Sequence, residues 1–235
     1  MTSADAPLIS VVVPCFNTER YVAEALDSVL AQPVRGVQVI VIDDGSTDRS
    51  AEIIRAHDDR IEYRRQANGG IGAARNAGIA LARGTYLTFL DADDIWTPGS
   101  LPLRLERLRG AECVYGGVEH FISPEIQGEA RERLGALPAT MTARFAGAML
   151  IEKRAFDRVG PFDAGLKMGE MMDWVSRAEL AGVTTVLIDD IVLRRRIHGS
   201  NTVLRLKNQK GEYLRALKGA LEHKRAAASK LDDQA

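Results

Sequence analysis

Four short segments with the composition of β-strands, separated by segments with helical spacing of apolar residues, constrain the fold of this chain most strongly. The strand-like segments are Leu8 to Cys15, Val37 to Ile42, Ile61 to Arg65 and Tyr86 to Leu90. Their lengths and their β-branched and aromatic residues are typical of strands. Strands that alternate with helices predict an α/β domain with a mostly parallel central sheet flanked by helices.

Residues that can contact a ligand, most of them polar, follow three of these segments at the point where each strand is expected to end. Phe16 and Asn17 follow the first, Asp43 and Asp44 follow the second, and the segment Asp91 to Asp94 follows the fourth. Ligands of parallel sheets bind beyond the carboxyl ends of the strands. We therefore expect these residues to meet at one edge of the sheet and to line a binding site.

The third of these clusters suits a metal ion. Alternate residues of an extended chain face the same way, so Asp91 and Asp93 can share one side and offer oxygen ligands to a single hard cation. The alternative is that these aspartates are turn residues and a helix cap.

The composition favours one domain without a nucleic-acid partner. The chain has 235 residues, and 46% of them are hydrophobic, which is enough for one large core. With 31 basic and 32 acidic residues the net charge is −1, so no global field attracts nucleic acid. Cys15 and Cys113 lie among apolar residues without metal-ligand spacing and predict reduced thiols in a cytoplasmic protein.

The two ends of the chain bear on its location. Residues 1–7 lack the basic and apolar regions of a signal peptide, and no apolar run approaches membrane-spanning length. Residues 203–235 predict a basic helix or tail with a solvated face, and binding of that face to anionic lipid is the alternative. We expect a cytoplasmic protein, and leave open a homodimer and weak association with the inner face of the membrane.

Four motifs resemble those of family 2 glycosyltransferases in order and spacing. They are Val11 to Asn17, Val41 to Asp48, Asn68 to Gly78 and Gly84 to Trp96, and the resemblance resumes from Gly169 to Asn201. It implies a GT-A fold and an inverting transferase that moves a sugar from a nucleotide-diphospho-sugar, with a UDP-sugar as the expected donor, to a hydroxyl-bearing acceptor. It also implies a divalent cation, Mn²⁺ or Mg²⁺.

The resemblance also divides the chain. Residues 1–202 are expected to form the GT-A domain, with a nucleotide-binding half at about 8–110 and an acceptor half at about 111–202 that includes a small antiparallel part. Regular alternation of strand and helix stops after Gly110, and residues 122–137 predict a polar, irregular excursion. Two further apolar runs, Thr184 to Ile188 and Ile191 to Leu193, predict two late strands. Acceptor recognition is expected at 119–140 and in the loops around Trp96 and Met168.

The resemblance assigns a set of residues to the donor and its cation. Asp93 is the expected direct metal ligand, Asp91 contacts the metal or the ribose, and His198 approaches the metal or the diphosphate. A structural role is the alternative for His198. The resemblance implies a set of nucleotide contacts: Pro14, Phe16, Asn17, Asp43, Asp44, Asn68, Gly70, Arg75, Asp91 and Ala92.

Four of the nucleotide contacts have structural alternatives. Phe16 would stack on the base, or it packs in the core. Asp43 or Asp44 would accept hydrogen bonds from the base, or it forms an Asx turn and caps a helix. Arg75 would contact the nucleotide, or it lies on the surface of its helix.

The general base is where the sequence departs from the family pattern. The family usually supplies it from a Glu-Asp pair that opens a helix, but here Met171 stands where that Asp is expected. Glu170 and Asp173 lie three positions apart and share a helical face, so either could take the proton of the acceptor hydroxyl. We choose Asp173. The alternatives are a first-turn helix acid for Glu170 and a structural partner of Arg177 for Asp173.

Two other functions are weighed against glycosyl transfer. Met171 motivates a catalytically impaired homologue that binds nucleotide sugars without turnover. A phosphatase would use Asp91 as nucleophile and Asp93 as acid, but the chain lacks a convincing downstream lysine loop and Asp43 to Asp48 would have no role.

Overall fold

The computed structural model describes residues 8–134, 138–199 and 218–219. The predicted basic segment at 203–235 lies outside these residues apart from Lys218 and Gly219. The elements, in chain order, are β1 (Ile9–Cys15), α1 (Val22–Leu30), β2 (Val37–Asp43), α2 (Ser50–His57), β3 (Ile61–Arg65), α3 (Ile71–Leu81), β4 (Tyr86–Phe89), β5 (Ile95–Trp96), α4 (Ser100–Arg107), β6 (Cys113–Ile122), α5 (Gly128–Leu134), β7 (Thr140–Thr142), η1 (Ala146–Ala148), β8 (Met149–Glu152), α6 (Lys153–Val159), α7 (Glu170–Leu180) and β9 (Thr185–Ile197).

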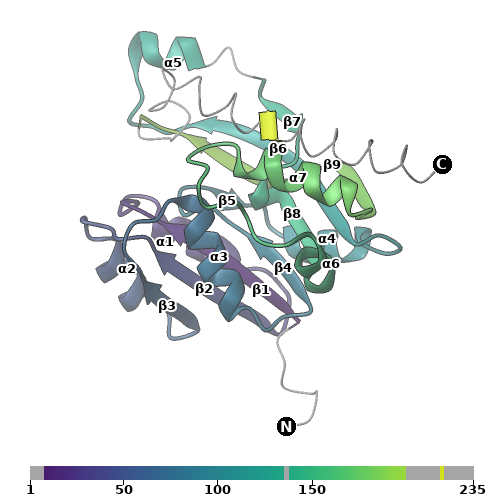
Figure 1. The fold of residues 1–235 in the computed structure, drawn as a ribbon. Helices are drawn as coiled ribbons and strands as arrows, with labels where there is room; N and C mark the ends of the chain where they lie inside the picture. The colour runs from purple at the N-terminus through teal and green to yellow at the C-terminus, as the bar shows by residue number, and fades with distance from the viewer. Residues whose placement is uncertain (1–7, 135–137, 200–217, 220–235) are drawn as a thin grey trace, which may run out of the picture.

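One mixed sheet runs through both halves of the molecule, in the order β3-β2-β1-β4-β8-β6-β9-β5, with β7 paired to β6 (Figure 1). Strands β1 to β4 pair in parallel. Strand β8 is antiparallel to both β4 and β6, whereas β9 is parallel to β6 and antiparallel to β5. The predicted α/β fold with helices around a largely parallel sheet and a smaller antiparallel part is confirmed.

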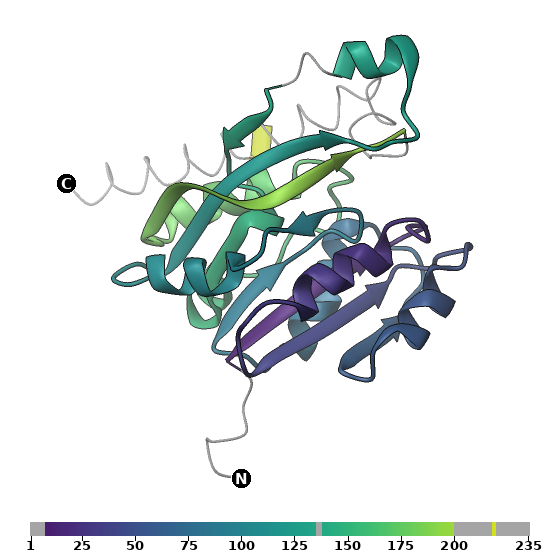
Figure 2. The ribbon, with the colours of Figure 1, turned by 180° about the vertical axis from the view of Figure 1, so that it is seen from behind.

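Helices cover both faces of the sheet, as the views from the two sides show (Figures 1 and 2). Strand β1 divides its side chains between two cores because alternate residues of a strand face opposite ways. Val11 and Val13 pack in the core that includes α1, and Val12 packs in the core that includes Ala74 of α3 and Trp174 of α7. The period-two pattern of this strand therefore positions a layer of helices on each side.

The second half of the chain is more regular than its sequence predicts. The two late apolar runs form the single strand β9, whose pairing with β6 shifts register between Tyr115 and Gly117, where Asp189 and Asp190 are accommodated. A side chain at Gly117 would lie 2.6 Å from the carbonyl oxygen of Asp189, which explains why the bulge needs glycine there. The expectation of an irregular excursion at 122–137 is wrong in part, because α5 lies within it.

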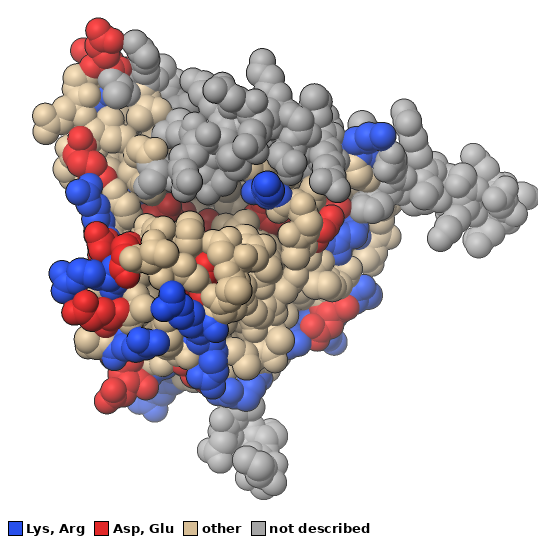
Figure 3. Space-filling view, turned by 60° about the vertical axis from the view of Figure 1, so that its left-hand side comes forward, with Lys and Arg blue, Asp and Glu red and all other residues tan. Residues whose placement is uncertain are grey.

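The surface carries charges of both signs. On the face shown in Figure 3, Lys and Arg side chains are interspersed with Asp and Glu side chains and form no broad field of one sign. No helix among the described residues is long and apolar enough to cross a membrane.

Candidate functional site

The loops that follow β1 and β2 are bonded to each other. The backbone N–H of Asn17 donates to the hydroxyl of Ser46 (3.0 Å), and the N–H of Thr47 donates to Oδ1 of Asn17 (2.8 Å). Asn17 has a positive φ of 53°, a conformation that asparagine tolerates better than most residues. Its side chain therefore joins two strand ends. Phe16 beside it is 41% exposed, so the core-packing alternative for Phe16 is wrong.

Asp43 is a buried carboxylate at the end of β2. It accepts hydrogen bonds from the N–H of Ser46 (2.7 Å) and the hydroxyl of Tyr63 (2.7 Å), and Arg65 lies 3.7 Å away. Burial raises the pKa of Asp43, but the bonds from Ser46 and Tyr63 and the charge of Arg65 outweigh it, so the pKa is lowered. The carboxylate stays ionised and holds a turn, as its structural alternative predicts.

Asp44 organises the glycine-rich turn that precedes α3. Its carboxylate accepts hydrogen bonds from Nε2 of Gln66 (2.7 Å) and from the N–H groups of Gly69 (2.9 Å) and Gly70 (2.8 Å). Gly70 has a φ of 85°, which favours glycine. Asn68 and Gly70 are both exposed in this turn, beside the ends of β2 and β3.

Two predicted nucleotide contacts are buried. Pro14 is buried in β1, where it pairs with Ile42 of β2. Ala92 is 2% exposed and belongs to the core on the α1 side of the sheet.

Arg75 links the end of β4 to helix α7. This side chain of α3 is buried, and its Nη2 lies 2.7 Å from Oδ1 of Asp91 while its Nη1 lies 2.6 Å from Oε1 of Glu170. The rings of Phe89 and Phe162 lie 6.0 and 5.6 Å from the guanidinium. Burial alone would lower the pKa of Arg75, but the charges of Asp91 and Glu170 raise it. The alternative that Arg75 lies on the helix surface is wrong, because the packing of α3 turns it inward.

Asp93 meets His198, although 105 positions separate them in the sequence. Oδ2 of Asp93 lies 2.8 Å from Nε2 of the buried His198. The neighbouring Asp94 is also buried and accepts a hydrogen bond from the N–H of Arg196 (2.9 Å). Burial raises the pKa of Asp94 well above its usual range, and the charges of Asp93 and Asp91 raise it further. Negative charge is thus concentrated at the end of β4.

This donor set fits a hard divalent cation. Asp93 and His198, whose side chains are hydrogen-bonded at 2.8 Å, offer one carboxylate and one imidazole at the same place. Such ions commonly take one or two carboxylates together with substrate phosphates. The described residues contain no group of three or more His, Cys, Asp or Glu side chains arranged to hold a metal. Of the three predicted metal ligands, Asp93 and His198 contact each other, whereas Asp91 is bonded to Arg75.

The two candidate bases lie in the first turn of α7, each in an ion pair. Glu170 contacts Arg75, and Oδ2 of Asp173 accepts a hydrogen bond from Nε of Arg177 (2.9 Å), as the structural alternative for Asp173 predicts. Met171 between them packs against the core on the α3 side of the sheet. Through Arg75, Glu170 is therefore linked to Asp91 at the end of β4, whereas Asp173 pairs with Arg177 of its own helix.

Sequence reasoning missed the residues that surround His198. Tyr21, just before α1, packs its ring on the imidazole, and Arg196 bonds through Nε to the carbonyl oxygen of Asp93 (3.0 Å). A cleft of about 450 Å³ opens beside Tyr21. It is lined by Asn17, Thr18, Glu19, Arg20, Tyr21, Asp48, Glu125, Ile126 and Gly199. The cleft brings together four segments that are distant in the sequence, and of its lining residues only Asn17 was among the predicted contacts.

The sequence of this chain is similar to those of known glycosyltransferases. The family model described as Glycosyl transferase family 2 matches residues 10–167. An uncharacterized glycosyltransferase of Rickettsia typhi is 30% identical over 225 residues, which cover 88% of this chain and 70% of that protein. Glycosyltransferase GlyG of Streptococcus pneumoniae is 46% identical over 92 residues, or 37% of this chain and 31% of that protein.

Solved structures share the fold. Residues 1–349 of S. aureus TarS in complex with UDP-GlcNAc align with a TM-score of 0.68 and 19% identity, over 83% of this chain and 60% of that one. The complex of the same protein with UDP aligns with a TM-score of 0.65 and 19% identity, over 82% of this chain and 61% of that one. The chain thus spans about 60% of the length of these structures, and the likeness confirms the architecture of the sheet and its helices.

Proposed function

The chain belongs to glycosyl transferase family 2 and has the GT-A fold, and from this premise we propose that it transfers a sugar from a UDP-sugar to an acceptor hydroxyl with inversion at the anomeric carbon. One observation carries the proposal. Arg75 joins Asp91, at the strand end where a donor would bind, to Glu170, on the helix where a base is expected. The UDP-GlcNAc and UDP complexes of TarS support a uridine donor.

The donor site is built from the strand ends. The exposed ring of Phe16 offers a face for stacking on the base. Asp43 and Asp44 hold the turns beside it, and Asn68 and Gly70 are exposed just before α3. Since the N–H groups of Gly69 and Gly70 already donate to Asp44, a phosphate would meet the N–H groups of the first turn of α3.

Asp93 and His198 would hold Mn²⁺ or Mg²⁺, with Asp91 beside them. When bound, the cation supplies a Lewis acid that stabilises the charge on the leaving diphosphate.

Glu170 and Asp173 are the candidates for the general base that takes the proton of the acceptor hydroxyl. Oε1 of Glu170 is bonded to Arg75, so Oε2 is the atom of this residue that would accept the proton. Asp173 would have to act as the general base while its Oδ2 accepts a hydrogen bond from Arg177. The connection to Asp91 through Arg75 favours Glu170 over the Asp173 chosen from sequence.

Purified protein with Mn²⁺ and a panel of UDP-sugars tests the proposal. We expect UDP to raise the melting temperature in the presence of Mn²⁺, and at least one UDP-sugar to be transferred or hydrolysed. Asp93→Asn should lose the Mn²⁺-dependent part of the shift, whereas Asp59→Asn, at an exposed position of the same residue type, should keep it. A protein that binds no UDP and turns over no UDP-sugar would refute the proposal.

A second candidate function is binding of the nucleotide sugar without turnover, and Met171 favours it. Both neighbouring carboxylates are held by arginines, and the side chain at 171 faces the core. The variant Met171→Asp distinguishes the two functions, because it supplies the acid that the family pattern expects. Turnover that is absent from the wild type and gained in Met171→Asp supports the binding protein, whereas turnover that the wild type already has, and that Met171→Asp keeps or loses, supports an enzyme that uses Glu170 or Asp173.

A further inference from the structure

The imidazole of His198 rests on the ring of Tyr21. The two ring centroids are 4.6 Å apart, with 44° between the ring planes. His198 follows β9 and Tyr21 precedes α1, so this contact joins two distant segments at the edge of the sheet where the strand-end aspartates lie. The same imidazole lies 2.8 Å from Asp93 through Nε2.

Tyr21 is itself held through its ring. The guanidinium of Arg196 lies 4.8 Å from the Tyr21 ring centroid and 4.6 Å from that of Phe121 on β6. Arg196 is 5% exposed and is fixed by an ion pair with Glu24 of α1 and by its bond to the carbonyl oxygen of Asp93. A cation between two aromatic rings gives Tyr21 a rigid support.

Tyr21 is also held through its hydroxyl, which donates to the carboxylate of Glu125. Ser123 contacts the same carboxylate through Oγ (2.5 Å), and its N–H donates to the carbonyl oxygen of Ile197 (2.9 Å). The segment that anchors the hydroxyl is therefore bonded to the residue that precedes His198. Ring and hydroxyl are fixed by separate groups, which leaves Tyr21 little freedom to turn.

We propose that Tyr21 is a positioning residue that orients His198 so that its Nε2 faces Asp93 and both can bind one divalent cation. This inference rests on the proposed function, since it concerns the same metal site. The physical basis is that an imidazole turns readily about its last torsion unless neighbours fix it, and groups that orient a metal-binding histidine change metal affinity by about 10- to 100-fold.

Titration with Mn²⁺ alone, followed by electron paramagnetic resonance and calorimetry without any nucleotide, tests this inference. We expect Tyr21→Leu to weaken Mn²⁺ binding by roughly 10- to 100-fold and Tyr21→Phe, which keeps the ring, to weaken it less. Tyr86→Leu, which removes a partly buried tyrosine from the opposite end of β4, is the matched control and should bind Mn²⁺ like the wild type.

A double-mutant cycle distinguishes positioning from general destabilisation. If Tyr21 acts through His198, then Tyr21→Leu has no further effect on Mn²⁺ affinity in a His198→Ala background. Wild-type affinity in Tyr21→Leu, or an equal loss in both backgrounds, overturns the inference. A wild type that binds Mn²⁺ but processes no UDP-sugar defeats only the proposed function, whereas a wild type that binds no Mn²⁺ defeats the positioning role as well.

Discussion

Nη1 of Arg75 and Oε1 of Glu170 lie 2.6 Å apart, although 95 positions separate the two residues in the sequence. The other terminal nitrogen of the same guanidinium bonds to Asp91. One buried cation thus neutralises two carboxylates, one from each half of the chain, and ties the end of β4 to the start of α7.

Replacing this cation should destabilise the fold. Arg75→Met leaves Asp91 and Glu170 facing each other without a counter-charge, and we expect the free energy of unfolding to fall by about 3–5 kcal/mol in urea titrations. Arg154→Met is the matched control, because Arg154 pairs with Glu152 at the surface and its loss should cost about 0–1 kcal/mol. Equal losses in the two variants would contradict the assigned role of Arg75.

The general base should be identified by two conservative substitutions on α7. We expect Glu170→Gln to lower kcat by roughly 10²- to 10⁴-fold with little change in KM, because it removes the proton acceptor and keeps the shape. Asp173→Asn should have a smaller effect, and Glu179→Gln, at the other end of the same helix, serves as the control. If Asp173→Asn causes the larger loss, Asp173 is the base; if neither variant loses activity, both assignments fail.

The bond between Tyr63 and Asp43 should make stability depend on alkaline pH. Burial, together with the bond to Asp43, raises the pKa of Tyr63 from 10.0 to about 12. Since the folded pKa is the higher one, this stabilisation is fully present below pH 10 and is lost as the pH rises toward about 12. Urea titrations at pH 9 to 12 should therefore show a shrinking difference between wild type and Tyr63→Phe. A constant difference would show that this tyrosine is not coupled to folding.

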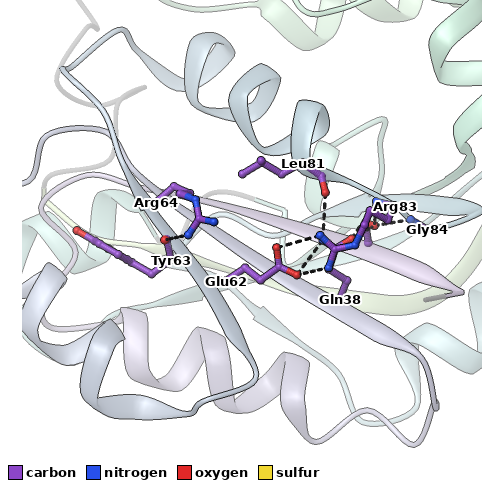
Figure 4. A network of polar contacts seen from close by, with 8 residues as sticks. Gln38, Glu62, Tyr63, Arg64, Leu81, Arg83 and Gly84 are labelled. Carbon is purple, nitrogen blue, oxygen red and sulfur yellow. Dashed lines mark hydrogen bonds and ion pairs between the residues drawn. The ribbon is translucent and has the colours of Figure 1, made fainter. Parts of the chain in front are cut away.

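Ser10 should stabilise the end of the sheet opposite the site. Its buried hydroxyl donates to Oε1 of Gln38 (2.7 Å) and accepts from the N–H groups of Arg83 (3.1 Å) and Gly84 (2.8 Å). Figure 4 shows the network of polar contacts to which Gln38, Arg83 and Gly84 belong.

Because Ser10→Ala deprives a buried N–H of its acceptor, we expect a loss of about 1–3 kcal/mol in unfolding free energy. Turnover by the folded protein should not change, since the network lies at the amino end of β1. Thr185→Ala, at an exposed position, is the control and should change the free energy of unfolding by no more than about 0.5 kcal/mol. Lost turnover in fully folded Ser10→Ala would show that the two ends of the sheet are coupled.

The strand ends were predictable because the patterns that mark them are local. The predicted site residues lie within a few positions of a buried strand: Pro14 to Asn17 at the end of β1, Asp43 and Asp44 at the end of β2, and Asp91 to Asp94 after β4. The two late apolar runs were interpreted as separate strands because Asp189 and Asp190 interrupt them, and only pairing with β6 makes them one strand.

By itself, the sequence determined the alternation of strands and helices and the positions of the polar residues at the strand ends, since period and composition act over short distances. Only the tertiary structure decided that Arg75 is buried between Asp91 and Glu170, that Phe16 is exposed, and that Tyr21 supports His198. These contacts join segments that local patterns cannot relate, because they depend on how α1, α3 and α7 pack against a sheet shared by both halves of the chain.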